Sequence, residues 1–451
     1  MKLRQKIGIG VLLIRRSSGV KGKLGALRQI AAAASRSRLT GKARAAQEAD
    51  VAANAWADYH LLGYVSRDIN VRLDEAQQKR VWVLLPELNA SVIFGGYIAL
   101  FQFMAFLQGR GYRTGVLVLK APGDQAALMQ SFAGNALVHG VLAAGPIEAI
   151  GVSRTVRLSP GDMLVAYNWT TALVAARMAR FVADPAYYYF AQEDERIFYA
   201  NDSYRFLAES VFLQDPRPRL ICNSQKLLDH FRAEGLVRDD AVVGVFEQGL
   251  PPAALPDRAE LAGRTPRRLA FYGRPEDHAK RNLMSIALLA LARAKRLGAF
   301  DAELWEFFML GSPRMGESFD LDGTTITCLP NQGYDAYRKT LTGFDLGISL
   351  MYAPHPSVPP FEMVRSGVVT VVNTTKGRPA DWYRAISANF EPGEPTLDGL
   401  AQAIARAAAR VNEVDARLAA ASTYHPESWE QSFAHLPAAL RHAIFLDEGQ
   451  K

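Results

Sequence analysis

One carboxylate in the second half of the chain occupies a position suited to binding a sugar hydroxyl. Glu362 lies between two apolar, strand-like segments, 346–351 and 368–373, with Pro359-Pro360 before it and Gly367 after it. These flanking residues predict a short helix with Glu362 in its first turn. A carboxylate near the carboxyl end of a parallel strand can accept two hydrogen bonds from the vicinal hydroxyls of a ribose. The competing interpretation is an acid that only complements the helix dipole.

Positive charge gathers directly after another apolar segment, 269–272. The residues concerned are Gly273, Arg274, Lys280 and Arg281. At the end of a strand and the start of a helix, cations and backbone N–H groups together can hold a diphosphate. The alternative is that the arginines pair with neighbouring surface acids such as Glu276 and Asp277.

A glycine pair, Gly95 and Gly96, follows the first apolar segment and opens a predicted helix. Glycine lets the backbone approach a phosphate closely and presents N–H groups to it. A plain turn would use the same residues, so the pair predicts a phosphate contact only in combination with the other motifs.

Acids and aromatic residues follow the apolar segment 187–191. The candidate sugar-binding residues here are Gln192, Asp194 and Glu195, with Trp169 at the end of a neighbouring predicted strand. Aromatic faces stack on sugar rings, whereas amides and carboxylates bind sugar hydroxyls. The alternative for this segment is a solvated acidic loop.

Short apolar segments alternate with helical segments from Val81 onward, a pattern typical of parallel βαβ units. The first series of predicted strands is 81–85, 114–119, 149–152, 163–167, 187–191, 220–222 and 242–246. The second series is 269–272, 304–310, 324–328, 346–351, 368–373 and 388–390. The fold class is therefore α/β, with two Rossmann-like, doubly wound domains facing a central cleft.

A segment rich in proline, 251–267, separates the two series and is interpreted as a linker. We predict four parts along the chain. They are a basic, helical N-terminal extension (1–80), a first Rossmann-like domain (81–262), a second Rossmann-like domain (263–425) and a C-terminal helix (426–451) that returns toward the first domain.

The first 50 residues are strongly basic, with twelve lysines and arginines against two acids, although the whole chain carries only +7. The positive charge therefore belongs to an alanine-rich arm and not to the α/β body. Such an arm is attracted to an anionic membrane surface. It has no aromatic residue before Trp56 and no nucleic-acid motif, so we expect no nucleic-acid partner. A solvated tail is the alternative.

The composition excludes several classes of protein. Apolar residues make up 49% and charged residues 22% of the 451 residues, as in ordinary globular proteins. Cys222 and Cys328 have no metal-ligand spacing, so neither a disulfide framework nor a structural zinc site is expected. The sequence has no apolar run of membrane-spanning length, and its first apolar stretch lacks a cleavage pattern. We expect a cytoplasmic protein, peripheral on the inner face of the membrane.

Taken together, these motifs resemble those of the GT-B glycosyltransferases of the large retaining family 4. Gly273-Arg274, Lys280-Arg281 and the block around Glu362 carry the resemblance. More narrowly, Phe-Ala-Gln-Glu-Asp-Glu-Arg-Ile-Phe-Tyr at 190–199 and Leu-Met-Tyr-Ala-Pro-His-Pro-Ser-Val-Pro-Pro-Phe-Glu-Met at 350–363 are similar to the WsaF-like rhamnosyltransferases, which build surface glycans. The resemblance covers about residues 81–440.

The resemblance implies a hexosyltransferase that uses a nucleotide-sugar donor and a glycan or lipid-linked glycan acceptor in surface polysaccharide synthesis. In the narrower case the sugar is L-rhamnose from dTDP-rhamnose. The first domain would then bind the acceptor and the second the donor. Transfer would proceed with retention, without a metal ion and without a cofactor besides the donor.

The resemblance also implies roles for individual residues. Glu362 would hold the donor ribose, Arg274, Lys280 and Arg281 would neutralise the diphosphate leaving group, and Gly95, Gly96 and Gly273 would approach the diphosphate. The acceptor or the transferred sugar would contact Trp169, Gln192, Asp194, Glu195 and His355. The family places a second glutamate where this chain has Pro354, so sugar recognition must use other groups.

Two other functions are compatible with these residues. A GT-B-type sugar-nucleotide epimerase would bind a nucleotide in the same cleft, and it would change the donor without any acceptor. A non-catalytic, membrane-associated binding protein would depend on the basic arm and use the α/β body as a scaffold. Deletion of residues 1–60 distinguishes the second alternative from an enzyme.

Overall fold

The computed structural model describes residues 69–440 apart from 94, 122, 151–154, 302, 312–315, 331 and 333, together with 59, 62, 63, 65 and 66. Asp68–Lys451 form one compact unit. The basic arm of residues 1–50, with its expected membrane contact, lies outside the described residues. Among the residues described, no helix combines the length and the apolar character that crossing a bilayer demands.

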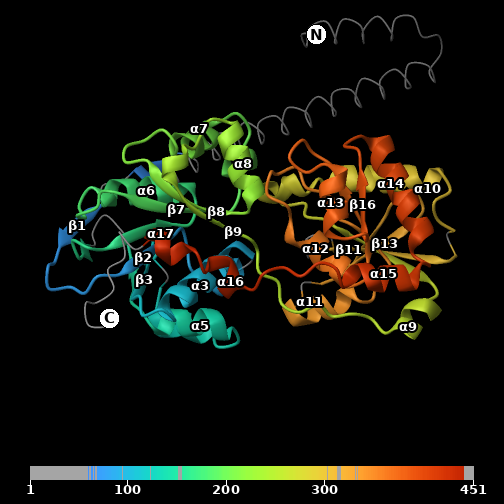
Figure 1. Ribbon diagram of the computed structural model, residues 1–451, viewed down its shortest axis with the longest axis horizontal. Coiled ribbons are helices and arrows are strands. Elements are labelled where there is room, and N and C mark those ends of the chain that lie inside the picture. Colours follow the sequence, from blue (N-terminus) through green and yellow to red (C-terminus); the bar gives the residue numbers. More distant parts are fainter. Residues whose placement is uncertain are drawn as a thin grey trace, which may run out of the picture. The chain divides into compact units, whose positions relative to one another are not determined.

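The first of two seven-stranded sheets has the strand order β4-β3-β2-β6-β7-β8-β9, with neighbouring strands parallel (Figure 1). Its strands are β2 (Val81–Leu85), β3 (Thr114–Val118), β4 (Ile147–Ala149), β6 (Met163–Ala166), β7 (Tyr187–Ala191), β8 (Pro218–Asn223) and β9 (Val242–Phe246). We call this sheet and the helices packed on it the first lobe.

The second sheet has the order β12-β13-β11-β10-β14-β15-β16, parallel except for β12, which runs antiparallel to β13. Its strands are β10 (Arg267–Tyr272), β11 (Trp305–Leu310), β12 (Ser318–Asp320), β13 (Thr325–Cys328), β14 (Leu346–Ile348), β15 (Val369–Asn373) and β16 (Phe390–Gly393). This sheet and its helices form the second lobe. The expected pair of Rossmann-like, doubly wound domains is confirmed.

Helices follow most strands, as the βαβ pattern requires. The α-helices are α3 (Gly95–Gln108), α4 (Gln125–Ser131), α5 (Ala136–Ala143), α6 (Trp169–Ala179), α7 (Ser203–Ser210), α8 (Gln225–Ala233), α9 (Arg258–Gly263), α10 (Met284–Arg296), α11 (Tyr334–Leu341), α12 (Val358–Arg365), α13 (Ala380–Ile386), α14 (Leu397–Arg410), α15 (Val414–Ala421), α16 (Trp429–Phe433) and α17 (Leu436–Leu440). Short 3-10 helices are η1 (Ala90–Val92), η2 (Glu195–Phe198), η3 (Asp239–Ala241) and η4 (Asp277–Asn282).

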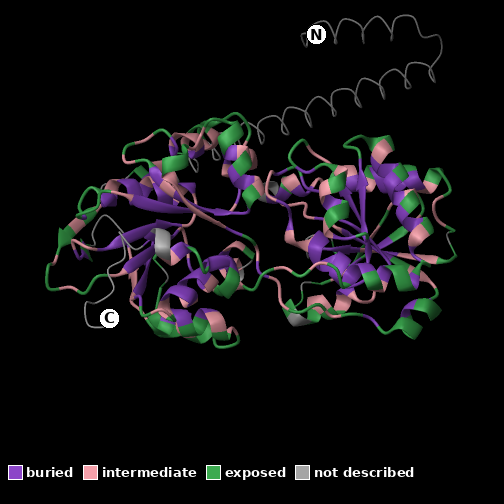
Figure 2. Cartoon of the chain, viewed as in Figure 1, coloured by how far each residue is buried: buried purple, intermediate pink, exposed green. Residues whose placement is uncertain are grey.

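The inner strands are buried along their whole length because helices cover both faces of each sheet (Figure 2). This explains why β2 reads Val-Trp-Val-Leu-Leu and β15 reads Val-Thr-Val-Val-Asn, without the alternation of a half-exposed strand. The buried inner strands therefore fix the positions of the loops that follow them.

In each sheet the first strand is central, and later strands lie on both sides of it. The direction in which strands are added therefore reverses between β2 and β6 in the first lobe and between β10 and β14 in the second. Ligands of doubly wound sheets bind outside the carboxyl ends of the strands at such a reversal. The loops after these four strands are therefore the places where a functional site is expected.

The C-terminal helices α16 and α17 lie against the first lobe, beside α3 and β9 (Figure 1). Phe433 packs with its ring centroid 5.5 Å from those of Phe103 and Phe106 and 5.2 Å from that of Phe246. The chain thus completes the second lobe and then adds a final apolar face to the core of the first.

A separate two-stranded sheet pairs β1 (Asn70–Leu73) with β5 (Thr155–Leu158) in parallel. Neither strand is expected from the sequence pattern, which places 70–73 in the N-terminal extension. Both strands have only four residues; β1 is mostly exposed, and β5 alternates between exposed and buried residues. Neither therefore shows the continuous apolar run by which the inner strands are recognised.

Candidate functional site

Glu362 lies in the second turn of α12, so the predicted first-turn position is wrong. The helix begins at Val358, one residue before Pro359, because both prolines fit in its first turn, where their missing N–H groups cost nothing. The dipole effect fades beyond the first turn, so the competing interpretation of Glu362 as a dipole-compensating acid loses its basis. Gly367 follows the helix with φ of +75°, as a helix-ending glycine does.

The Glu362 carboxylate is buried and faces two phenols of α11. The hydroxyl of Tyr334 donates a hydrogen bond of 2.6 Å to its Oε1. Burial raises the pKa of Glu362, although the hydroxyls of Tyr334 and Tyr337 favour its charged form. The carboxylate therefore depends on hydroxyl donors, which is the chemistry that a ribose offers.

Three predicted site residues lie close enough to Tyr272, the last residue of β10, to influence its phenol. The charges of Arg274, Arg281 and Glu362 all act on this hydroxyl. Arg274 also donates from Nε to Oε2 of Glu276 over 3.3 Å, which is the local pairing considered from the sequence. The structure thus brings two cations and one acid together at the point where the strand order of the second sheet reverses.

Gly273 has a packing reason in this structure. A Cβ there would lie 2.7 Å from the ring of Phe271 and 3.0 Å from Sδ of Met309. The absence of a side chain therefore lets the turn after β10 close over the core, and Arg274 is placed by that turn.

Lys280 and Arg281 share η4 but differ in position. Lys280 is exposed, whereas Arg281 reaches the first lobe, with Cζ 4.6 Å from the ring centroid of Phe198. Burial lowers the pKa of Arg281, and the carboxylates of Glu193 and Glu195 oppose this by favouring its charged form. Arg281 therefore connects the residues around Tyr272 with the first lobe.

The glycine pair opens α3, as predicted, and its two members have different surroundings. A Cβ on Gly96 would lie 2.8 Å from the hydroxyl of Tyr167, and its carbonyl accepts a hydrogen bond of 2.9 Å from Nε2 of Gln192. A Cβ on Gly95 would meet no atom within 4 Å. Gly96 and Gln192 are thus tied together, while the backbone at Gly95 has room beside it.

Asp194 is held by side chains of its own lobe. Its carboxylate accepts hydrogen bonds of 2.9 and 2.8 Å from Arg196 and lies 2.9 Å from Nε2 of His230 on α8. Burial alone would raise the pKa of Asp194, but the contacts with His230 and Arg196 outweigh it and lower the pKa to about 2. Both oxygens are therefore engaged in holding η2 against α8.

Glu195 and Trp169 form part of the wall of the first lobe. Oε2 of Glu195 accepts hydrogen bonds of 2.6 Å from both the backbone N–H of Trp169 and the hydroxyl of Tyr189. Burial raises the pKa of Glu195 to about 7. The indole N–H of Trp169 donates to the hydroxyl of Tyr199 over 2.9 Å, and its side chain is buried. These groups orient one another and leave little of the indole face for stacking on a sugar.

His355 joins the two lobes. Its Nδ1 lies 2.9 Å from Oγ of Ser224, the residue that caps α8 in the first lobe. Burial and the charges of Arg378 and Arg281 lower the pKa of His355 to about 3, so the imidazole is neutral. A neutral imidazole offers one donor and one acceptor at the end of β14, near the position where the family resemblance places a glutamate.

Sequence reasoning missed three residues that the structure places beside this group. Glu193 stands in the predicted acidic segment but was not singled out from its neighbours. Arg378 follows β15 in a Gly-Arg-Pro turn, and Tyr334 begins α11; neither carries a motif that marks it. Only the tertiary contacts described above identify them.

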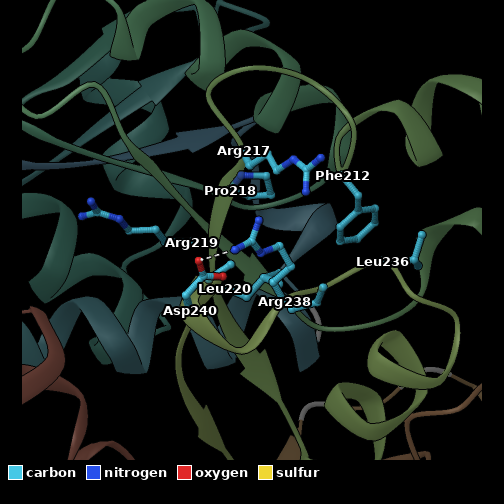
Figure 3. Close-up of a pocket in the computed structure, with 10 residues that line it drawn as sticks. Phe212, Arg217, Pro218, Arg219, Leu220, Leu236, Arg238 and Asp240 are labelled. Carbon is cyan, nitrogen blue, oxygen red and sulfur yellow. Dashed lines mark hydrogen bonds and ion pairs between the residues drawn. The ribbon is translucent and has the colours of Figure 1, made fainter.

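A hollow of about 200 Å³ lies elsewhere in the first lobe, at the amino ends of β8 and β9 (Figure 3). Two of its arginines are paired, Arg219 with Asp184 over 2.9 Å and Arg238 with Asp240 over 3.1 Å. Since the strands are parallel, this hollow faces away from the strand ends that carry the predicted site residues. In the described part of the chain there is no cluster of three or more His, Cys, Asp and Glu side chains arranged to hold a metal ion.

Comparisons with known proteins agree with the geometry of the second lobe. The family model described as WsaF, C-terminal domain, matches residues 267–405. The chain is 28% identical over 355 residues to the O-antigen biosynthesis protein RfbC of Myxococcus xanthus. The match covers 75% of this chain and 25% of RfbC, so the chain spans about a quarter of the length of that curated relative.

Two solved structures share the architecture of both lobes. A mutant of S. aureus TarM in complex with fondaparinux, alpha-GlcNAc-glycerol and UDP superposes with a TM-score of 0.55 at 8% identity, covering 81% of this chain and 100% of TarM. Anabaena HepE in complex with UDP superposes with a TM-score of 0.52 at 15% identity, covering 80% of this chain and 100% of HepE. At these identities the likeness concerns the fold alone, which is the GT-B fold of two Rossmann-like lobes.

Proposed function

We propose that the protein is a glycosyltransferase that moves a sugar from a nucleotide-diphosphate donor to a glycan acceptor in the synthesis of a surface polysaccharide. The observation that carries this proposal is the proximity of Arg274, Arg281 and Glu362 to Tyr272. It puts an acid suited to a ribose and two cations suited to a diphosphate at one strand end. The matches of the second lobe to the WsaF family model and of the chain to RfbC support it.

In this proposal the second lobe binds the donor. Glu362 accepts hydrogen bonds from the ribose, while Arg274 and Arg281 stabilise the negative charge that develops on the departing diphosphate. Exposed Lys280 remains a further candidate contact to the phosphates, and the open backbone at Gly95 suits an approach from the first lobe. The acceptor enters on the side of the first lobe.

Finer assignments follow from the resemblance of the two long motifs. We propose membership of family 4, transfer with retention, and L-rhamnose from dTDP-rhamnose as the donor. No catalytic metal is needed in this proposal because the guanidinium groups supply the charge that a bound cation supplies elsewhere. The basic arm would hold the enzyme at an anionic membrane surface.

Titration calorimetry with UDP and dTDP tests the donor site. We expect wild-type protein to bind at least one of them and Glu362→Ala to bind it at least thirtyfold more weakly, since two hydrogen bonds to a charged group are worth about 2 to 4 kcal/mol. Glu303→Ala is the control, because Glu303 is an exposed acid of the second lobe. Absence of wild-type affinity for both nucleotides would contradict the proposal.

Product analysis tests the reaction. Incubation with a panel of nucleotide sugars and extracted glycan acceptors is expected to release nucleoside diphosphate and a lengthened glycan, in the presence of EDTA as well as in its absence. The anomeric configuration of the new bond, measured by NMR, decides between retention and inversion. A donor that changes its sugar without any acceptor would indicate an epimerase instead.

A further inference from the structure

Glu193 is the acid after β7 whose carboxylate is least engaged by its own lobe. Its Oε1 accepts a hydrogen bond of 3.0 Å from the backbone N–H of Asp194. Within the described residues no side chain donates to this carboxylate or forms an ion pair with it. Asp194 and Glu195, in contrast, are each held by side chains of the first lobe. Of the three adjacent acids, Glu193 therefore has the most bonding capacity left for a ligand.

The carboxylate of Glu193 stands close to the place where the second lobe contacts the first, since Arg281 of the second lobe lies over the ring of Phe198, five residues further along the chain. The charges that act on it most strongly from outside its own strand are those of Arg281, in η4 after β10, and Arg378, in the loop after β15. Both loops lie at the carboxyl ends of strands of the second sheet. Glu193, which follows the carboxyl end of β7, is therefore near the strand ends of the lobe that is proposed to bind the donor. Residues distant in sequence thus meet at this point.

Neither arginine neutralises Glu193 by direct contact. Arg378 is fully buried and donates to the carbonyl oxygens of Met351 and Ala353 over 2.8 and 2.9 Å and to the hydroxyl of Tyr383 over 2.9 Å. Its guanidinium is therefore fixed on the second lobe. Arg281 lies over the ring of Phe198. The two charges are held in place around the carboxylate.

A buried carboxylate without an ion pair is costly to keep. The exposed fraction of Glu193 is 8%, and burial raises its pKa to about 7, although Arg281 favours the charged form. The protein gains no stability from such a group. Buried, perturbed carboxylates between two domains are typical of sites that act on a ligand.

We propose that Glu193 binds the attacking hydroxyl of the acceptor, an inference that rests on the proposed function. The hydroxyl donates to Glu193 on one side and lies on the other side next to the sugar whose diphosphate is held by Arg281. The acceptor oxygen forms the new bond to the anomeric carbon. The bond from that carbon to the diphosphate oxygen breaks, its electron pair leaves with the nucleoside diphosphate, and the hydroxyl proton passes to that diphosphate. Glu193 orients the hydroxyl and keeps its own protonation state.

The test separates acceptor binding from donor binding. Glu193→Ala is expected to raise the acceptor KM or lower the kcat of transfer so that kcat/KM for the acceptor falls at least thirtyfold. Affinity for the nucleoside diphosphate and for the intact nucleotide sugar, and the slow transfer of the sugar to water, are expected to stay within about twofold of wild type. Glu193→Gln keeps the shape and one acceptor oxygen, so it should restore part of the loss.

Glu148 provides the matched control. It is a partly buried glutamate of the first lobe whose pKa burial also raises, but it lies on β4 at the outer edge of the sheet. Glu148→Gln is expected to leave all of these parameters unchanged. Thermal unfolding of each variant excludes a loss caused by misfolding.

Three results would overturn the inference. Equal loss of nucleoside diphosphate affinity in Glu193→Ala would assign Glu193 to the support of Arg281. Loss of nucleotide-sugar affinity alone would assign it to the transferred sugar, and unchanged transfer would remove it from the site. A wild-type protein that binds no nucleotide and transfers no sugar would instead refute the proposed function, and this inference with it.

Discussion

The hydroxyl of Tyr334 lies 2.6 Å from Oε1 of Glu362, so the acid assigned to the donor ribose already has a hydroxyl partner from its own lobe. Tyr334 begins α11, and 49% of its surface is exposed, so its ring can move without disturbing the core. If a ribose binds Oε1 of Glu362, as the proposed function implies, it must share this oxygen with the phenol or displace it. In that case the contact weakens donor binding by about the free energy of one hydrogen bond.

Removal of the Tyr334 hydroxyl is expected to strengthen nucleotide binding. In Tyr334→Phe the carboxylate loses its competing donor, and we expect about fivefold higher affinity, equivalent to about 1 kcal/mol. Titration calorimetry with the preferred nucleoside diphosphate measures it. Tyr112→Phe in the first lobe is the control. Weaker binding by Tyr334→Phe would show instead that the phenol contacts the nucleotide.

Loss of Asp194 is expected to destabilise the first lobe. Arg196 and His230 would lose their common partner inside the protein, and breaking a buried pair from one side costs about 3 to 5 kcal/mol. Urea unfolding of Asp194→Ala at pH 7 checks this. Since the folded-state pKa of about 2 lies below the ordinary value, the stabilisation is present above about pH 4 and is lost as the pH falls toward 2.

The exposed pair of Arg258 and Asp415 provides the control for this experiment. Asp415→Ala is expected to change the stability little, because solvent screens exposed ion pairs. A similar effect of both substitutions would contradict the buried role of Asp194.

Ionisation of Glu195 is expected to lower the free energy of unfolding as the pH rises. Its pKa in the folded state, about 7, lies above its ordinary value of 4.5, so the folded protein binds more protons than the unfolded chain between these values. Stability contributed by the protonated acid is therefore lost from about pH 4.5 to 7. Glu195→Gln should be more stable than wild type at pH 8, by an amount on the order of 3 kcal/mol, and nearly equal at pH 4. Urea unfolding at both pH values decides this, and a variant less stable at pH 8 would refute it.

Ser224 combines a strained backbone with two side-chain contacts. Its φ of +83° is unfavourable for any residue except glycine. Its Oγ accepts a hydrogen bond from the backbone N–H of Leu227 and lies 2.9 Å from Nδ1 of His355. Ser224→Gly relieves the strain, whereas Ser224→Ala keeps it and loses both contacts. We expect the glycine variant to exceed the alanine variant in unfolding free energy by about 2 kcal/mol. Equal stabilities would show that the strain is negligible.

The inner strands were predictable because each is a continuous apolar segment bounded by turn residues. The predicted segments 81–85, 187–191 and 242–246 coincide with β2, β7 and β9. The strands β1, β5 and β12 were not predicted because they have only three or four residues, lack a continuous apolar run and pair with one neighbouring strand each.

The part of the candidate site in the second lobe was also largely predictable from the sequence. Arg274 is the second residue after β10, and Glu362 lies in the short helix between β14 and β15. The positions of these two residues are restricted because β10 and β14 are neighbouring parallel strands, whose carboxyl ends lie side by side at one edge of the sheet. Which of Lys280 and Arg281 turns toward the first lobe was not decided, since both lie in the same turn.

By itself the sequence determined the α/β alternation, the two series of strands and the kinds of side chain at their carboxyl ends, because local apolar runs and turn residues specify these. Only the tertiary structure decided which of the adjacent acids has partners in its own lobe and which does not. Asp194 is hydrogen-bonded to Arg196 and contacts His230, whereas Glu193 is influenced by the charges of Arg281 and Arg378. Adjacent side chains of one segment point in different directions, and their charge depends on partners that only folding brings to them.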